Sequence, residues 1–130
     1  MNSTMDANRL VARLTPVICP RRLTPLTCAI EVVCEHMQNS AADDLHFTKD
    51  VYPVVSARLG KPQASIERSI FRAVEDCWMH GDNPYMNEII GRRLPVKPKP
   101  SEFIRYCAFY LTYGYPYHAA KEERSMPLPF

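Results

Sequence analysis

One long amphipathic segment, Gln63–His80, dominates the pattern of this sequence. Its apolar residues recur at helical spacing and fall on one side at about 100° per residue. They are Ile66, Ile70, Ala73, Val74 and Cys77. Gly81 follows at a position where helices commonly end. Because a helix with one apolar face gains stability by burying that face, the segment predicts a helix packed within a helical domain.

Five further segments combine apolar residues at helical spacing with start or stop signals. Their predicted openings are Asp6, Thr24 followed by Pro25, Thr48, Asn83 followed by Pro84, and Ser101, and their predicted ends are Pro16, Gln38, Gly60, Gly91 and Gly114. Pro53 falls in the first turn of the third segment, because proline would break a helix interior. No stretch alternates convincingly as a strand. We therefore predict an all-α fold, a six-helix bundle with short connections.

The chain length of 130 residues fits one domain of ordinary size. We expect a single helical domain at residues 1–114 and a tail containing proline and tyrosine at residues 115–130. Hydrophobic residues make up 46% and charged residues 23%, which argues against a disordered or coiled-coil chain. No apolar run approaches the ~20 residues of a membrane helix, and the N-terminus lacks the pattern of a secretion signal.

Cysteine and histidine usage argues against disulfide, metal and enzyme chemistry. Five cysteines include no CxxC pair, and four histidines are scattered without metal-binding spacing. We expect reduced thiols in a cytoplasm, no metal and no other cofactor. No nucleophile stands at a recognisable spacing from a base, and the glycines are explained as helix ends or turns. The sequence therefore predicts a protein that is not an enzyme.

The basic residues are concentrated in two stretches, although the net charge is only +2. Residues 52–73 contain four basic residues and one acid, and residues 91–100 contain four basic residues and no acid. The two stretches together carry a charge of +7, and the rest of the chain carries −5. Such clustering favours a polyanion partner more than the net charge does.

Residues 48–80 have the spacing of a helix-turn-helix, in which a helix and a turn at Gly60 precede a longer helix that can enter the major groove of DNA. The outward side of the second helix centres on Arg68, whose fork matches the O6 and N7 acceptors of guanine. The residues predicted to bind DNA are Arg58, Lys61, Gln63, Ser65, Arg68, Phe71, Arg72, Arg92, Arg93, Lys97 and Lys99. Arg58 and Lys61 would meet the DNA backbone. The alternative is an amphipathic helix with a solvated polar face.

Phe71 lies among these outward residues although it is apolar. It could contact a thymine methyl group, which is readable in the major groove. It could equally be a partly buried aromatic side chain. The sequence favours neither role.

An ordered set of short motifs identifies a likeness to a known family. The set consists of YP at 52–53, ERxI at 67–70, AxE at 73–75, Trp78, Gly81 and KPxxSEFI at 97–104. Over residues 10–111 the chain resembles the C-terminal effector domain of the sporulation response regulator, stage zero sporulation protein A. The resemblance implies a bacterial six-helix domain of the winged-helix-like, response-regulator effector type, which binds double-stranded DNA and activates or represses transcription.

The resemblance also implies a role for Glu67 beside Arg68 in the recognition helix. Ser65 and Phe71 stand where basic residues are expected in the family. We therefore expect the operator sequence, the affinity or both to differ. In the family the effector follows a phosphorylatable receiver domain, for which 130 residues leave no room, so we expect control without phosphorylation.

The family pairs on tandem sites through its final helix, where this chain carries an aromatic stripe of Tyr106, Phe109 and Tyr113. We expect a homodimer interface there, because aromatic residues are enriched where proteins meet. The alternative is that residues 115–130 cover the stripe. A second hypothesis for function is an adaptor or antagonist that keeps the fold and binds a full-length regulator or RNA polymerase instead of DNA.

Overall fold

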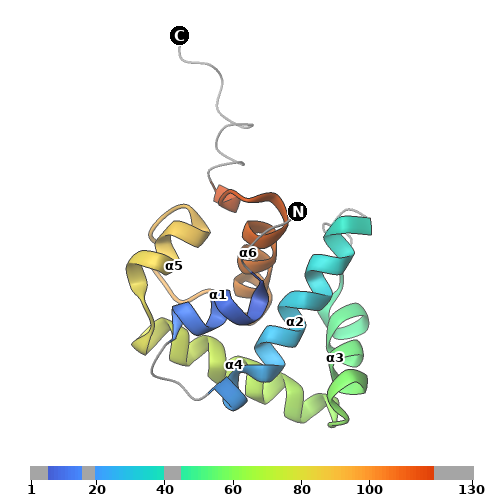
Figure 1. Cartoon of the computed structure of the whole chain (residues 1–130). Helices are drawn as coiled ribbons and strands as arrows, with labels where there is room; N and C mark the ends of the chain where they lie inside the picture. Colours follow the sequence, from blue (N-terminus) through green and yellow to red (C-terminus); the bar gives the residue numbers. More distant parts are fainter. Residues whose placement is uncertain (1–5, 16–19, 40–44, 119–130) are drawn as a thin grey trace.

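The computed structural model describes residues 6–15, 20–39 and 45–118, and it is all-helical over these residues (Figure 1). The helices are α1 (Ala7–Leu14), α2 (Pro20–Asn39), α3 (Tyr52–Leu59), α4 (Gln63–His80), α5 (Asn83–Ile90) and α6 (Pro100–Tyr113), with a π-helical turn, η2 (Phe47–Val51), leading into α3. No strand occurs in the described part of the chain. The predicted all-α bundle of six helices is therefore confirmed.

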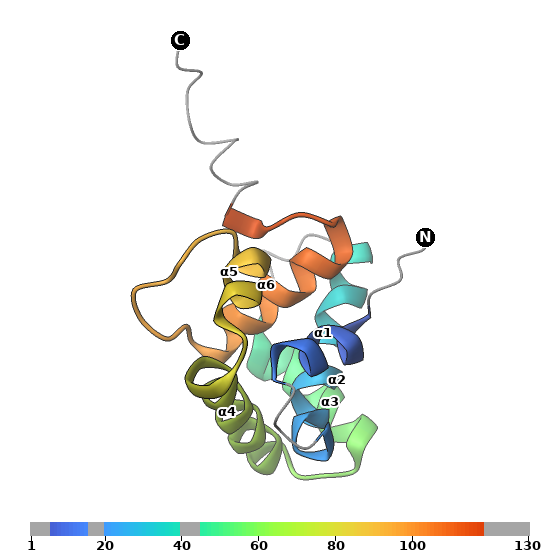
Figure 2. The ribbon, with the colours of Figure 1, turned by 60° about the vertical axis from the view of Figure 1, so that its left-hand side comes forward.

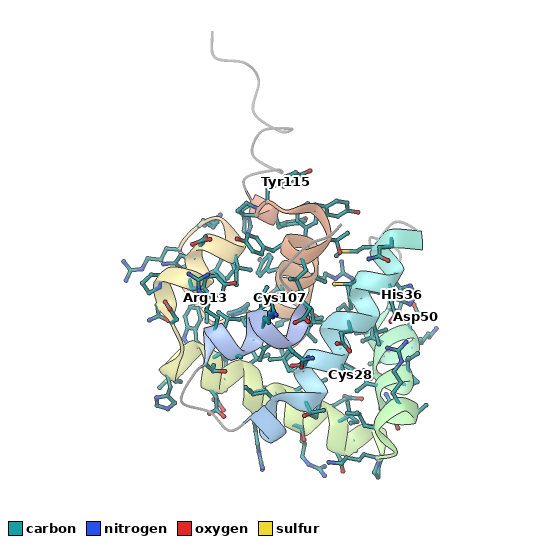
Figure 3. All side chains as sticks on the ribbon, viewed as in Figure 1. Arg13, Cys28, His36, Asp50, Cys107 and Tyr115 are labelled. Carbon is teal, nitrogen blue, oxygen red and sulfur yellow. The ribbon has the colours of Figure 1, made fainter. Side chains whose placement is uncertain are left out.

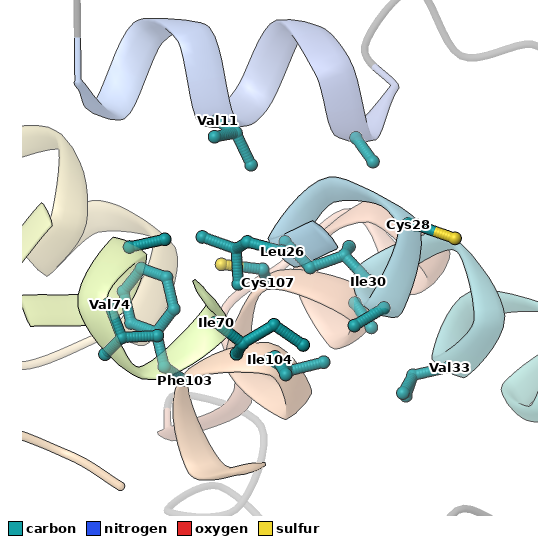
Figure 4. Close-up of a cluster of buried hydrophobic side chains, with 14 of the residues drawn as sticks. Val11, Leu26, Cys28, Ile30, Val33, Ile70, Val74, Phe103, Ile104 and Cys107 are labelled. Carbon is teal, nitrogen blue, oxygen red and sulfur yellow. The ribbon is translucent and has the colours of Figure 1, made fainter. Parts of the chain in front are cut away.

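The core forms around α2, which packs most extensively against α6 and α4 (Figure 1). Every member of the predicted apolar stripe of α4 is buried. Figure 4 shows Ile70 and Val74 of this stripe near Phe103 and Ile104 of α6, with Val11 of α1 pointing toward them. Burying an aliphatic or aromatic side chain contributes roughly 1.5–3 kcal/mol, so this shared core fixes how α4 is oriented and which face it leaves outside.

The start of α1 agrees with the sequence. Asp6 is its N-cap, and the carboxylate Oδ1 accepts a hydrogen bond from the backbone N–H of Arg9 at 2.9 Å. The helix ends at Leu14 and is capped by Thr15. Pro16, the predicted end, lies outside the described residues.

Two predicted helix starts and one predicted cap are wrong. The second helix begins at Pro20 instead of Thr24, so Pro25 lies inside it. The added turn buries Leu23, which is 3% exposed. The free energy gained by this burial offsets part of the cost of the hydrogen bond that Pro25 cannot donate. Tertiary packing has here overridden a local start signal.

Helix α5 begins at Asn83 as predicted but is capped by the residue before it, and α6 begins at Pro100, one residue before its predicted cap. Asp82, and not Asn83, is the N-cap of α5, since its carboxylate accepts the N–H of Tyr85 at 3.0 Å. Lys99, and not Ser101, takes the cap position of α6. There the Lys99 N–H donates to the carboxylate of Glu102 at 2.9 Å, and Pro100 occupies the first helical position.

The segment predicted to open at Thr48 begins as the π-helical turn η2. The N–H of His46 donates to the Asp50 carboxylate at 3.0 Å, which closes this turn. The N–H of Tyr52 bonds to the carbonyl of Phe47, five residues back, and Pro53 then falls in the first turn of α3 as predicted.

Candidate nucleic-acid interface

The predicted helix-turn-helix is formed by α3, a short turn and α4, which pack against each other. Gly60 ends α3 with φ of 66°, a left-handed conformation that glycine adopts without strain. Its N–H and that of Lys61 both donate to the carbonyl of Ser56, at 2.9 and 3.2 Å. These bonds turn the chain so that α4 begins at Gln63 with its N-terminal end close to α3.

The outward face of α4 carries the side chains that the sequence predicted. Arg68, Phe71, Arg72 and Glu75 are exposed, and Ser65 is half-buried. An open groove follows this face and is lined by Tyr52, Glu67, Arg68, Phe71, Arg72, Glu75 and Pro100. The groove therefore joins residues of α3, α4 and α6 on one surface.

Six of the predicted cations are exposed and form no ion pair with a carboxylate of the described residues. They are Lys61, Arg68, Arg72, Arg92, Arg93 and Lys99. In Figure 2 the loop between α5 and α6, which carries Arg92 and Arg93, extends to one side of the bundle above α4. This loop is proline-interrupted and buries Pro98, while Val96 at its outer part is 70% exposed.

Lys97 is not free, although it lies in the same loop. Its Nζ is 3.4 Å from Oε2 of Glu75 and 4.9 Å from the centroid of the Phe71 ring. Both contacts draw the lysine onto the outward face of α4. Phe71 remains 48% exposed, so it is partly covered by Lys97 and still open to a partner.

Arg58 is also engaged within the protein. Its guanidinium binds Glu35 of α2 through two hydrogen bonds, at 2.8 and 3.3 Å. These bonds lower the pKa of the Glu35 carboxyl from its ordinary value. Arg58 therefore ties α3 to α2 in this conformation.

Gln63 and Glu67 at the start of α4 bind each other. The Gln63 amide donates to the Glu67 carboxylate at 2.9 Å and to the Thr48 carbonyl at 3.5 Å. Tyr52, which the sequence analysis did not assign to the site, lines the groove beside Glu67. Burial, and then the nearby Glu67 charge, raise the pKa of the Tyr52 hydroxyl. Its presence in the YP motif was the only sequence signal for it.

The aromatic stripe of α6 is in contact with the start of the tail. The Phe109 ring lies 5.6 Å from that of Tyr115 and 5.3 Å from that of Tyr117, and His118 Nε2 is 3.2 Å from the Tyr106 hydroxyl. Tyr115, beyond the end of α6 in Figure 3, remains 48% exposed. Residues 115–118 therefore contact part of the stripe, while Tyr113 remains 47% exposed, and residues 119–130 lie outside the described part.

The described cysteines are free thiols, and burial raises the pKa of each, which disfavours the thiolate form. Burial raises the pKa of Cys77 to about 12, and it raises the pKa of Cys107 well above its ordinary value. Among the described residues, no group of three or more His, Cys, Asp and Glu side chains could hold a metal ion. In the same part of the chain, none of the helices has the length and apolarity needed to span a membrane.

A six-helix bundle that exposes an arginine-bearing helix-turn-helix defines a DNA-binding effector domain. The chain belongs to the family described as Sporulation initiation factor Spo0A C terminal, which matches residues 24–111. This match confirms the resemblance found in the sequence, and the family is one of DNA-binding domains of a sporulation regulator, not of enzymes. No solved structure matches the chain.

Proposed function

We propose that this chain is a sequence-specific transcriptional regulator that inserts α4 into the major groove of its operator, in the cytoplasm. The observation that carries the proposal is the position of Arg68. It is exposed at the centre of the outward face of α4 and pairs with no carboxylate of the described residues. A free guanidinium on a groove-sized helix is suited to bind guanine through two hydrogen bonds.

The neighbouring side chains have complementary roles in this proposal. Arg72 flanks Arg68 on the same face, and Phe71 offers an apolar ring for a thymine methyl group. Ser65 and Glu67 read further base edges near the start of α4. For Glu67 to make such a contact, its hydrogen bond with Gln63 either breaks or persists and positions the carboxylate.

The remaining cations would position the duplex. Lys61 lies beside the N-terminal end of α4, where backbone N–H groups and the helix dipole favour a phosphate. Arg92, Arg93 and Lys99 extend the basic surface along the loop that precedes α6. Contacts of this kind add affinity and register but no base specificity.

Selection of bound sequences from a random DNA pool tests the proposal. We expect a short enriched motif containing guanine, bound with an affinity that falls steeply with salt. Recovery of DNA without an enriched motif would contradict sequence-specific reading. Substitution of Arg68 should then remove the preference for the guanine of the motif.

One observation favours the adaptor hypothesis instead. Two of the predicted DNA-binding cations, Arg58 and Lys97, are paired within the protein. If no duplex binds with a steep salt dependence, binding to a full-length regulator or to RNA polymerase becomes the better account. Pairing of two copies on tandem sites through α6 belongs to the DNA-binding proposal and requires that the start of the tail leaves the aromatic stripe.

A further inference from the structure

Glu75 is an exposed acid on a face that is otherwise suited to a polyanion. It lies one helical turn beyond Phe71 and Arg72, and 48% of its side chain is exposed. Its carboxylate is 3.4 Å from the ammonium group of Lys97, which comes from the loop before α6. Lys97 also sits over the ring of Phe71, 4.9 Å from its centroid.

These contacts bring three side chains together on the face of α4 that also carries Arg72. Arg72 and Phe71 face outward from α4, Lys97 approaches from the loop, and Glu75 is the carboxylate that the lysine binds. A cation adds to duplex affinity by neutralising a phosphate and releasing its counterion. A lysine bound to a carboxylate is part of an ion pair with no net charge, and while it is so bound it does not neutralise a phosphate.

We propose that Glu75 withholds one phosphate contact from the DNA-binding surface by holding Lys97 against α4. The inference rests on the proposed DNA-binding function and reverses the role that the sequence predicted for Lys97. The Phe71 ring adds a second attraction on the same ammonium group, so the lysine has two protein partners to leave before it reaches a phosphate. The consequence is a lower sequence-independent affinity, which limits occupancy of DNA that α4 does not read.

The test compares Glu75→Gln, Lys97→Met and the double variant on a duplex of random sequence, across a series of salt concentrations. Glutamine keeps the shape of the side chain without its charge, and methionine keeps an apolar contact with Phe71. We expect Glu75→Gln to steepen the slope of log affinity against log salt by about 0.9, the value for one added phosphate contact. Affinity at low salt should rise roughly twofold to fivefold, the range of an exposed ion pair.

Lys97→Met alone should have the same salt slope as the unchanged protein, because Lys97 makes no phosphate contact while Glu75 holds it. In the Glu75→Gln background the same change should cancel the added slope. Glu88→Gln is the matched control, since it removes the same charge from α5, where Glu88 accepts a hydrogen bond from Tyr110 at 3.1 Å. The control should not change the slope.

An unchanged slope in Glu75→Gln, or a loss of about 0.9 in Lys97→Met alone, overturns the inference while leaving the proposed function standing. If neither the unchanged protein nor Glu75→Gln binds duplex DNA, the inference and the proposed function both fail. Far-ultraviolet circular dichroism verifies that each variant is folded. If Glu75→Gln does not fold, the salt slope of Lys97→Met tests the inference alone: an unchanged slope supports it, and a loss of about 0.9 overturns it.

Discussion

The backbone carbonyl of Leu14 accepts a hydrogen bond from the N–H of Asp82 at 2.8 Å. This bond joins the end of α1 to the turn between α4 and α5. Gly81, in that turn, has an extended backbone with φ of −84°, so a left-handed conformation is not the reason for glycine here. A Cβ at position 81 would instead lie 2.4 Å from the Cys77 carbonyl and 2.6 Å from the Leu14 carbonyl.

Gly81→Ala should therefore destabilise the protein by about 1–3 kcal/mol, because two backbone oxygens have to move. Urea unfolding measures the loss. Gly114→Ala is the control, since no atom lies within 4 Å of its added Cβ and only the backbone conformation, with φ of 81°, opposes the change. A loss at Gly81 no larger than the loss at Gly114 would contradict the close-approach explanation.

Arg68→Ala should cost about 1–3 kcal/mol of discrimination between the selected operator and a duplex with its guanine replaced. The physical reason is the loss of a guanidinium that forms two hydrogen bonds with one base. Fluorescence anisotropy on the two duplexes measures the change. Arg13→Ala is a control that removes an arginine from α1, where it stacks 3.9 Å from the centroid of the Tyr85 ring. Equal discrimination by the Arg68 variant and the unchanged protein would place base reading elsewhere.

Lys99→Ala should weaken binding to all duplexes alike and reduce the salt slope by about 0.9, as expected for one lost phosphate contact. The cap of α6 is not disturbed, because it uses the backbone N–H of Lys99 and the Glu102 carboxylate. Salt titrations on operator and random duplexes provide the measurement. A loss confined to the operator would show that Lys99 reads a base.

The Arg58–Glu35 pair should make stability depend on pH. Arg58 lowers the pKa of Glu35 below its ordinary 4.5, so the pair stabilises the folded state above that pH and loses this effect as pH falls through the lowered pKa. Both side chains are exposed, at 41% and 54%, so the contribution should stay under about 1 kcal/mol.

Glu35→Gln should consequently reduce the free energy of unfolding at pH 7 and leave it unchanged at an acidic pH below the lowered pKa, where the unchanged protein has also lost the charge. Urea unfolding at the two pH values makes the comparison. An equal loss at both pH values would mean that the substitution acts through packing and not through the ion pair.

Tyr115→Ala combined with Tyr117→Ala should strengthen self-association, because both rings contact Phe109 and shield the aromatic stripe of α6. Sedimentation velocity over a range of protein concentrations measures the change, with and without operator DNA. Adding Tyr113→Ala to this double variant should weaken self-association again, because it removes part of the exposed stripe. Unchanged sedimentation in the first variant would argue against α6 as the pairing surface.

Helix periodicity explains why much of the fold could be predicted. The apolar spacing of Gln63–His80 selected every buried residue of α4, and the same rotation placed Arg68 on the opposite side. Both results depend only on residues within a few turns of each other. The helix-turn-helix followed for the same reason, with Gly60 at its turn.

Helix starts were less predictable because several nearby residues compete for each cap. Asp82 and Asn83 are both good N-cap residues, and the tertiary path of the turn decides which one faces the free N–H groups. At α2 the burial of Leu23 favours a helix that begins at Pro20, four residues before the local start signal at Thr24. Cap identity is thus set partly by packing.

The sequence by itself determined that this chain forms a helical DNA-binding effector domain with an arginine-bearing outward helix, because helical period and motif spacing are local properties. Only the tertiary structure decided which cations remain available. Arg58 meets Glu35 and Lys97 meets Glu75 across more than twenty residues of chain. Such pairs form when separate helices and loops are packed side by side, and no local pattern specifies which carboxylate a distant cation will reach.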